Sequence, residues 1–272
     1  MAAVSWVTGA WRRFVVANLR AIDAAPAPPP GRVCREARVT IVYLVSALTL
    51  AMMSYAVLNH GVQTEVSHGI IALAGFIDPD LSAALAPYQP LLRIIAWSLG
   101  AFTFYFAIPA LIVRRVFGHR LGDYGLSLRG VRGHLWVYFA LFVPVAVAVL
   151  MVAAAPDFQA KYPFYRKPLG WEDLVVWELF YALQFFSLEF FFRGFLLHGV
   201  KDRLGRHAIF VMVVPYVMIH FSKPLYESLG AVIAGSVLGL LSLRTGSVVG
   251  GFLIHVGVAV TMDLAALFHR GF

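Results

Sequence analysis

The chain has 272 residues, of which 60% are apolar and 13% are charged, and its formal net charge at pH 7 is +8. A soluble protein of this length could not cover its surface with so few polar side chains, so the composition predicts a membrane protein and excludes a disordered, collagen-like or disulfide-rich chain. The basic excess does not indicate nucleic-acid binding, because most lysines and arginines fall on segments predicted to lie on the inner side of a membrane.

The first 38 residues are predicted to form a separate cytoplasmic region. Val4, Trp11 and Val15 recur at helical spacing while arginines occupy other positions, which is typical of an amphipathic helix lying in the inner membrane interface. Residues 25–31 read Ala-Pro-Ala-Pro-Pro-Pro-Gly, which ends a helix and forms a stiff linker. We therefore expect this helix and linker over 1–38 and a transmembrane bundle over 39–272.

The rest of the chain predicts an all-α, polytopic membrane bundle of about seven transmembrane helices. The expected spans are 39–59, 91–113, 135–154, 173–198, 208–222, 229–243 and 247–268. Two of them are short for a bilayer and can cross it only if other helices surround them. Small residues at a spacing of four, Ala231, Gly235 and Gly239, favour close packing of this kind, although glycine is also simply common in membrane helices.

Lysine and arginine are divided unequally between the two sides of these spans. If the N-terminus is inside, fifteen of them fall on inner segments and five on outer segments, while Arg93 and Arg193 lie within spans. This bias predicts a cytoplasmic N-terminus, and seven spans place the C-terminus outside. Arginine outnumbers lysine and alanine is abundant, as in GC-rich bacterial coding sequences. The expected location is thus a bacterial inner membrane.

Polar groups inside the predicted spans indicate where function lies, because each is costly in hydrocarbon. Glu189 and Arg193 are four residues apart in a phenylalanine run of the fourth span, His220 lies well inside the fifth, and His255 lies in the seventh. Each feature alone has a structural explanation: Glu189 and Arg193 could be an ion pair, and a histidine in a membrane helix could be a packing residue.

The depths of these residues favour a common site. At a rise of about 1.5 Å per residue, Glu189, His220 and His255 fall within roughly 6 Å of one another in depth. A carboxylate in an apolar shell can act as a base for water, and two imidazoles can stabilise an oxyanion or bind a metal. Two His and one Glu also form a common zinc ligand set, so the residues leave open a zinc site or a metal-free glutamate site.

The same residues resemble the motifs of the CAAX-protease and bacteriocin-processing (CPBP, Abi) family of intramembrane peptidases. Residues 188–194, Leu-Glu-Phe-Phe-Phe-Arg-Gly, resemble its Glu-Glu-x-x-x-Arg helix. Tyr216 and His220 are similar to the second motif, in which the aromatic residue is usually Phe, and His255 to the histidine of the third. The resemblance covers 173–263, which we predict to be a peptidase-like core.

The chain departs from the family pattern at two positions. Leu188 replaces the first glutamate, which the family uses to activate water, and Ala259 replaces the asparagine that commonly follows the last histidine. Glu189 would have to take over as the carboxylate. Glu178, three turns earlier, is expected at a solvated outer interface, and Asp263 is expected to have a structural or outer-rim role.

The resemblance implies an intramembrane endopeptidase that hydrolyses membrane-associated proteins or peptides. Glu189 would be the general base, His220 and His255 would orient water and stabilise the oxyanion, and Arg193 would hold the carboxylate. Glu189, His220 and His255 are also the candidate ligands of a zinc ion. One alternative is an inactive member that serves as a membrane scaffold or immunity factor, and another is a proton-coupled transporter. The substrate, the cleavage position and the oligomeric state stay open.

Overall fold

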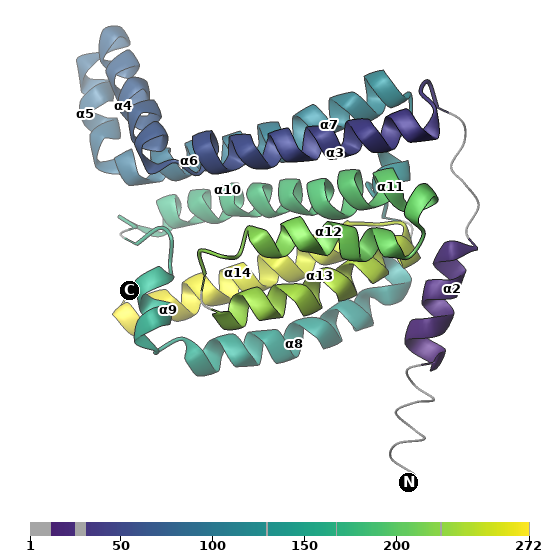
Figure 1. Ribbon diagram of the computed structural model, residues 1–272. Helices are drawn as coiled ribbons and strands as arrows, with labels where there is room; N and C mark the ends of the chain where they lie inside the picture. The colour runs from purple at the N-terminus through teal and green to yellow at the C-terminus, as the bar shows by residue number, and fades with distance from the viewer. Residues whose placement is uncertain (1–11, 25–30, 129, 167, 224, 272) are drawn as a thin grey trace. The chain divides into compact units, whose positions relative to one another are not determined.

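The computed structural model describes residues 12–24, 31–128, 130–166, 168–223 and 225–271, and every regular element among them is helical. The all-α prediction is confirmed. The α-helices are α2 (Ala17–Asp23), α3 (Arg35–Met52), α4 (His60–Ile77), α5 (Pro79–Leu85), α6 (Gln89–Ala101), α7 (Ile108–Leu111), α8 (Leu135–Val152), α9 (Pro156–Lys161), α10 (Trp171–Glu189), α11 (Leu197–Leu204), α12 (His207–Met218), α13 (Leu225–Thr245) and α14 (Val249–Arg270), as drawn in Figure 1.

Short helices of other pitch join several of these elements. The π-helical segments are η1 (Arg12–Val16), η2 (Met53–Val57), η4 (Phe102–Ala107), η5 (Ile112–Phe117) and η8 (Phe190–Leu196). The 3-10 segments are η3 (Ala86–Tyr88), η6 (Leu121–Tyr124) and η7 (Arg132–His134). Because π-helical turns mark functional positions in many membrane and soluble helices, η8 is of interest: it begins directly after Glu189.

Six helical stretches of the described chain are long and apolar enough to cross a membrane. They are Arg35–Val57, Pro79–Phe117, Arg132–Val152, Trp171–Leu204, Leu225–Thr245 and Val249–Arg270. The predicted polytopic bundle is therefore confirmed. The expected span 208–222 is a shorter apolar helix, α12, which ends at Met218.

The described part of the N-terminal region agrees with a helix, formed by η1 and α2 over residues 12–23. Residues 1–11 and 25–30, which carry the rest of the predicted amphipathic helix and most of the Pro-rich linker, lie outside the described residues. Asp23 at the end of α2 accepts hydrogen bonds from the backbone N–H and Nε of Arg206 at 2.8 and 2.6 Å. This pair connects α2 to the turn before α12.

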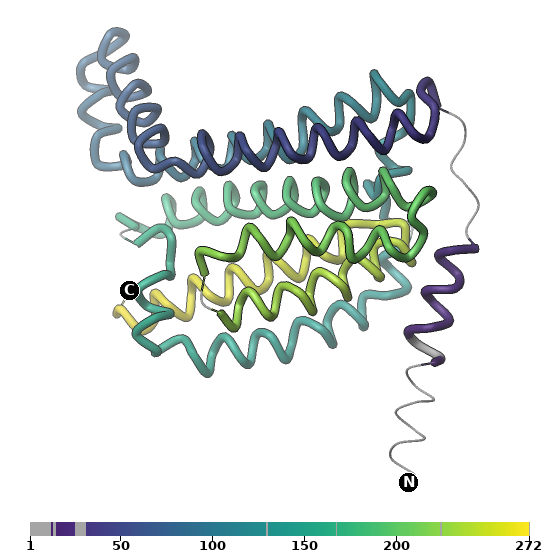
Figure 2. Tube along the Cα trace, viewed as in Figure 1, coloured from purple at the N-terminus to yellow at the C-terminus, as the bar shows by residue number. Residues whose placement is uncertain are grey.

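The helices divide into two compact units, and several helices contribute to both. The first unit contains Met1–Val45, Pro109–Leu135 and Glu189–Gly251. Within it α12 and α13 lie side by side (Figure 2). A Cβ at Gly235 would lie 2.9 Å from the ring of Tyr216, and one at Gly239 would lie 3.0 Å from Met212. The predicted close approach along the small-residue stripe is confirmed, because the missing side chains let α12 approach the α13 backbone.

The second unit contains Ser46–Ile108, Trp136–Leu188 and Phe252–Phe272. One of its buried clusters joins α6, α10 and α14, and its members are Leu91, Tyr165, Leu174, Trp177, Tyr181, Ala259 and Leu267. Trp97 of α6 stacks on Trp177 of α10 with ring centroids 6.2 Å apart. Contacts of this kind add attraction beyond the area buried, which fixes the relative rotation of these helices.

Candidate active site

Glu189 and Arg193 form an ion pair that is closed to solvent within the first unit. Arg193 Nη1 lies 3.0 Å from Glu189 Oε1, and both residues are 0% exposed. Glu189 is the last residue of α10, and Arg193 lies in the π-helical turn that follows. Burial of two charges costs several kcal/mol per ion unless they are paired, so each side chain keeps the other charged and in place. Glu189 thus points into the protein rather than toward lipid.

Tyr216 of α12 covers the other side of the guanidinium. Arg193 Cζ lies 3.8 Å from the centroid of the Tyr216 ring, and Tyr216 is itself 1% exposed. A cation over an aromatic face in a desolvated site is stabilised by about 2 kcal/mol. Phe192 packs on the same ring edge-on at 5.3 Å. Arg193 is therefore held between a carboxylate and an aromatic ring.

Gly251 of α14 brings the backbone of that helix against the Glu189 carboxylate. A Cβ at residue 251 would approach Glu189 Oε2 more closely than real Cβ contacts allow and would lie 3.0 Å from the carboxylate carbon. Only glycine leaves room for the carboxylate at this position. The carboxylate thus has its orientation set by Arg193 on one side and by the α14 backbone on the other.

His220 follows α12 instead of lying well inside a span, which corrects the predicted position. The helix ends at Met218, and His220 lies in a turn closed by the hydrogen bond from Lys223 N to its carbonyl. Its Nδ1 is 2.8 Å from the Tyr216 carbonyl, and its ring packs on the Tyr216 ring at 4.9 Å. A carbonyl only accepts, so Nδ1 carries a proton and, in the neutral ring, Nε2 carries the lone pair.

His255 lies on α14 in the second unit and is partly buried. Its ring stacks on Phe185 of α10, with centroids 5.5 Å apart and planes 10° from parallel. Gly251 and His255 are four residues apart on one helix, so they share a face of α14. This packing restricts the orientation of the His255 imidazole.

Comparison with known protein families gives a match in the C-terminal part of the chain. Residues 170–261 match the family model described as Type II CAAX prenyl endopeptidase Rce1-like. This C-terminal part, the Rce1-like segment, is similar to that family. The resemblance predicted for 173–263 is confirmed, and the matched family is one of CAAX-type intramembrane proteases. No curated protein and no solved structure matches the chain.

The Rce1-like segment contains all four predicted site residues, of which the structure joins three through Tyr216. Glu189 pairs with Arg193, Arg193 contacts the Tyr216 ring, and the Tyr216 carbonyl holds His220. Among the described residues, no three His, Cys, Asp or Glu side chains gather closely enough to hold a metal ion. Of the predicted zinc ligands, Glu189 and His220 belong to the first unit and His255 to the second, so a zinc site formed by all three stays a prediction.

Sequence reasoning missed the contacts of Gly251 and misjudged Glu178. Gly251 precedes His255 by one turn, but this spacing alone does not reveal that the backbone at Gly251 lies against Glu189. Glu178 was expected to be solvated, but both of its carboxylate oxygens are buried and lack a hydrogen-bond partner among the described residues. Asp263 is 0% exposed and accepts a hydrogen bond from Trp177 Nε1 at 2.8 Å, which agrees with a structural role rather than a place at the outer rim.

Proposed function

We propose that the protein is an intramembrane endopeptidase that hydrolyses peptide bonds of membrane-associated proteins or peptides. The buried Glu189–Arg193 pair, held by Tyr216 and faced by Gly251, is the observation that carries this proposal. A general base must be ionised before the reaction, and Arg193 supplies the opposite charge that a buried carboxylate requires. The pair lies in the Rce1-like segment, which supports protease chemistry at the level of the family.

In this mechanism Glu189 takes a proton from a water molecule as the water oxygen attacks the scissile carbonyl. The proton then passes from Glu189 to the leaving amine, and the peptide bond breaks. His220, with Nδ1 bonded to the Tyr216 carbonyl, directs Nε2 to the reacting groups. A neutral ring accepts a hydrogen bond from the attacking water through Nε2, and a ring that solvent has protonated before the reaction donates one to the oxyanion. His255 is the second group of this kind. Arg193 orients the base and does not transfer a proton.

Glu189→Gln tests the general base. We expect it to abolish the new protein termini that appear in the membrane fraction of cells expressing the wild-type chain. Glu172→Gln is the matched control, because Glu172 is an exposed glutamate at the start of the same helix. His220→Gln and His255→Gln should lower cleavage, whereas the exposed His207 and His269 should tolerate the same change. Unchanged cleavage by Glu189→Gln would disprove the mechanism.

Glu189→Gln also leaves the Arg193 charge buried without its partner, and this defect is expected to cost about 3–5 kcal/mol. The double variant Glu189→Gln with Arg193→Met removes both charges and should recover most of that stability while staying inactive. Measuring the thermal unfolding of both variants separates lost folding from lost chemistry.

Leu188 supports a second candidate function. The family pattern has its first glutamate at this position, so a chain without it could act as a membrane scaffold or immunity factor that has lost catalysis. A scaffold would keep its biological effect in the stable double variant, and a peptidase would lose it. We place either form in the inner membrane of a bacterium, with the N-terminus in the cytoplasm, on the basis of the charge bias and composition.

A further inference from the structure

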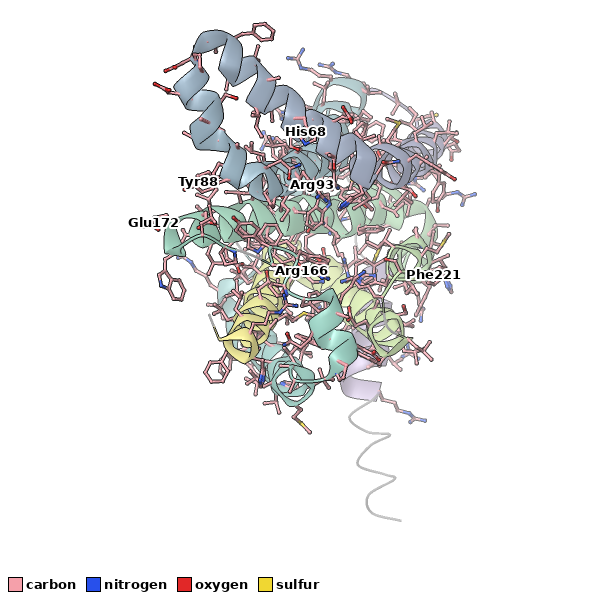
Figure 3. The ribbon with its side chains drawn as sticks, turned by 90° about the vertical axis from the view of Figure 1, so that its left-hand side faces the viewer. His68, Tyr88, Arg93, Arg166, Glu172 and Phe221 are labelled. Atoms are coloured by element: carbon pink, nitrogen blue, oxygen red, sulfur yellow. The ribbon has the colours of Figure 1, made fainter. Side chains whose placement is uncertain are left out.

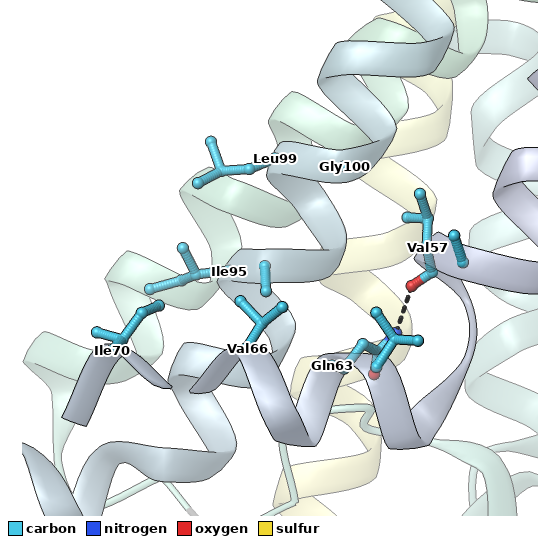
Figure 4. A pocket seen from close by; sticks show the side chains of 10 residues that line it. Val57, Gln63, Val66, Ile70, Ile95, Leu99 and Gly100 are labelled. Carbon is cyan, nitrogen blue, oxygen red and sulfur yellow. Dashed lines mark hydrogen bonds between the residues drawn. The ribbon is translucent and has the colours of Figure 1, made fainter. Parts of the chain in front are cut away.

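An open apolar groove runs between α4 and α6 in the second unit, apart from the site described above (Figure 4). Its volume is about 300 Å³, and its lining is almost wholly aliphatic. The lining residues are Ala56, Val57, Val62, Gln63, Val66, Ile70, Ile95, Ala96, Leu99 and Gly100. The polar side chain in this wall, Gln63, donates to the Val57 carbonyl at 2.8 Å, which leaves a surface suited to hydrocarbon.

A positively charged residue lies beside this groove. Arg93 is in the second turn of α6 and lies next to α4 (Figure 3), where its Nη2 is 2.7 Å from Nδ1 of His60. His60 and Gln63 are three residues apart on α4, as are Arg93 and Ala96 on α6, so the Arg93–His60 pair adjoins the groove lining on both helices.

Arg93 forms no ion pair with any described residue, and its buried Nε lacks a hydrogen-bond partner there. Glu65 is the acidic residue of α4, and it does not pair with Arg93. Arg93 also belongs to the candidate span Pro79–Phe117, where a guanidinium without a counterion is costly. Arg93 therefore requires an anionic partner, and that partner must also fit beside an apolar groove.

We propose that this groove binds one acyl chain of an anionic bilayer phospholipid, with the lipid phosphate on Arg93. The hydrocarbon tail fills the aliphatic groove, and the guanidinium pairs with phosphate oxygens, for which its planar fork is well shaped. The charge selects an anionic over a zwitterionic headgroup, and the groove selects a lipid over free phosphate. The bound lipid ties α4 to α6.

Native mass spectrometry of the purified full-length chain tests the proposal, with phosphatidylglycerol and phosphatidylcholine of the same chain length as probes. We expect the wild type to retain phosphatidylglycerol at least about fivefold better, since one cation near anionic lipid contributes roughly 1 kcal/mol. Arg93→Gln should abolish the preference, and Arg93→Lys should keep most of it. Arg166→Gln is the matched control, because Arg166 is an exposed arginine of the same unit whose guanidinium contacts a backbone carbonyl.

Filling the groove tests the other half of the proposal. Ala96→Phe should lower retention of both lipids, whereas Ala72→Phe, at an exposed position of α4 outside the groove, should not. Inorganic phosphate should not displace the bound lipid. Equal retention of both lipids by the wild type, an unchanged preference in Arg93→Gln, unchanged retention in Ala96→Phe, or displacement by phosphate would each overturn the proposal. Monodisperse elution and unchanged helical circular dichroism establish that each variant is folded.

Discussion

The absence of a side chain at Gly251 allows the carboxylate of Glu189 to occupy its position. Gly251→Ala adds a Cβ that overlaps Oε2, and the carboxylate cannot move away without leaving Arg193. A displacement of about 1 Å can cost 10²-fold in rate, so we expect at least a tenfold loss of proteolysis. Gly230→Ala is the control, because a Cβ there meets no atom within 4 Å. Normal cleavage by Gly251→Ala would contradict the assigned geometry.

The Tyr216 ring, rather than its hydroxyl, is expected to matter for Arg193. Tyr216→Phe keeps the aromatic face over the guanidinium and should retain most of the activity. Tyr216→Leu removes that face from a fully buried cation and should lower both stability and turnover, by about 2 kcal/mol in unfolding free energy. Thermal unfolding and cleavage measured in parallel check this. Equal behaviour of the two variants would show that the cation–π contact is unimportant.

Individual residues illustrate how far sequence reasoning reaches. Glu189 and Arg193 could be selected because charges inside hydrocarbon are rare, and the helical spacing made an ion pair the natural alternative to a catalytic role. The contact of Gly251 with Glu189 could not be selected, because it depends on how closely two separate helices approach. The predicted position of His220 was wrong because the helix ends at Met218 and His220 lies in the turn that follows, which periodicity does not reveal.

At the scale of elements, α13 owes its packing to the small residues on one face. Gly235→Leu would place a side chain where the Tyr216 ring lies, 2.9 Å from the position of a Cβ. Overpacking of this kind typically costs about 1–3 kcal/mol, and here it would also displace the ring that holds Arg193. We expect lower thermal stability and lower proteolysis than in Gly230→Leu, whose site is open. Similar losses in both variants would argue against a special role for the stripe.

The helices were also predicted only in part. Long apolar runs predicted the spans well, because hydrophobic length is a property of local sequence. The π-helical segments, such as η8 after Glu189, were not predicted, since a change from i→i+4 to i→i+5 hydrogen bonding leaves no mark in the apolar pattern. The burial of the Glu178 carboxylate oxygens was missed for a related reason, because the burial of a side chain depends on tertiary packing and not only on the pattern of its own helix.

For the whole molecule, the loop between η5 and η6 is expected to make stability sensitive to mild acid. His119 is 5% exposed, its Nδ1 lies 3.1 Å from the Tyr124 hydroxyl, and burial lowers its pKa below the ordinary value of 6.5. As the pH falls through 6.5, the unfolded chain binds a proton that the folded chain does not. This contribution to stability is therefore complete above pH 6.5 and is lost progressively below it.

The variant His119→Gln removes the titrating group while keeping a polar side chain near Tyr124. Its melting temperature should fall less than that of the wild type between pH 7 and pH 5.5, as measured in the same detergent. His134→Gln is the control, because His134 lies outside the core and bonds to a local carbonyl. If His119→Gln and the wild type lose the same stability over this range, another group causes the acid sensitivity.

Gly251 also predicts which substitutions the evolving chain could accept at this position. Every single-base change of a glycine codon that alters the amino acid adds a side chain, so an ancestor that needed the Glu189 carboxylate could accept none of them without penalty. Glycine at this position should therefore accompany glutamate at 189 among relatives, and the two should be lost together in lineages that have abandoned hydrolysis.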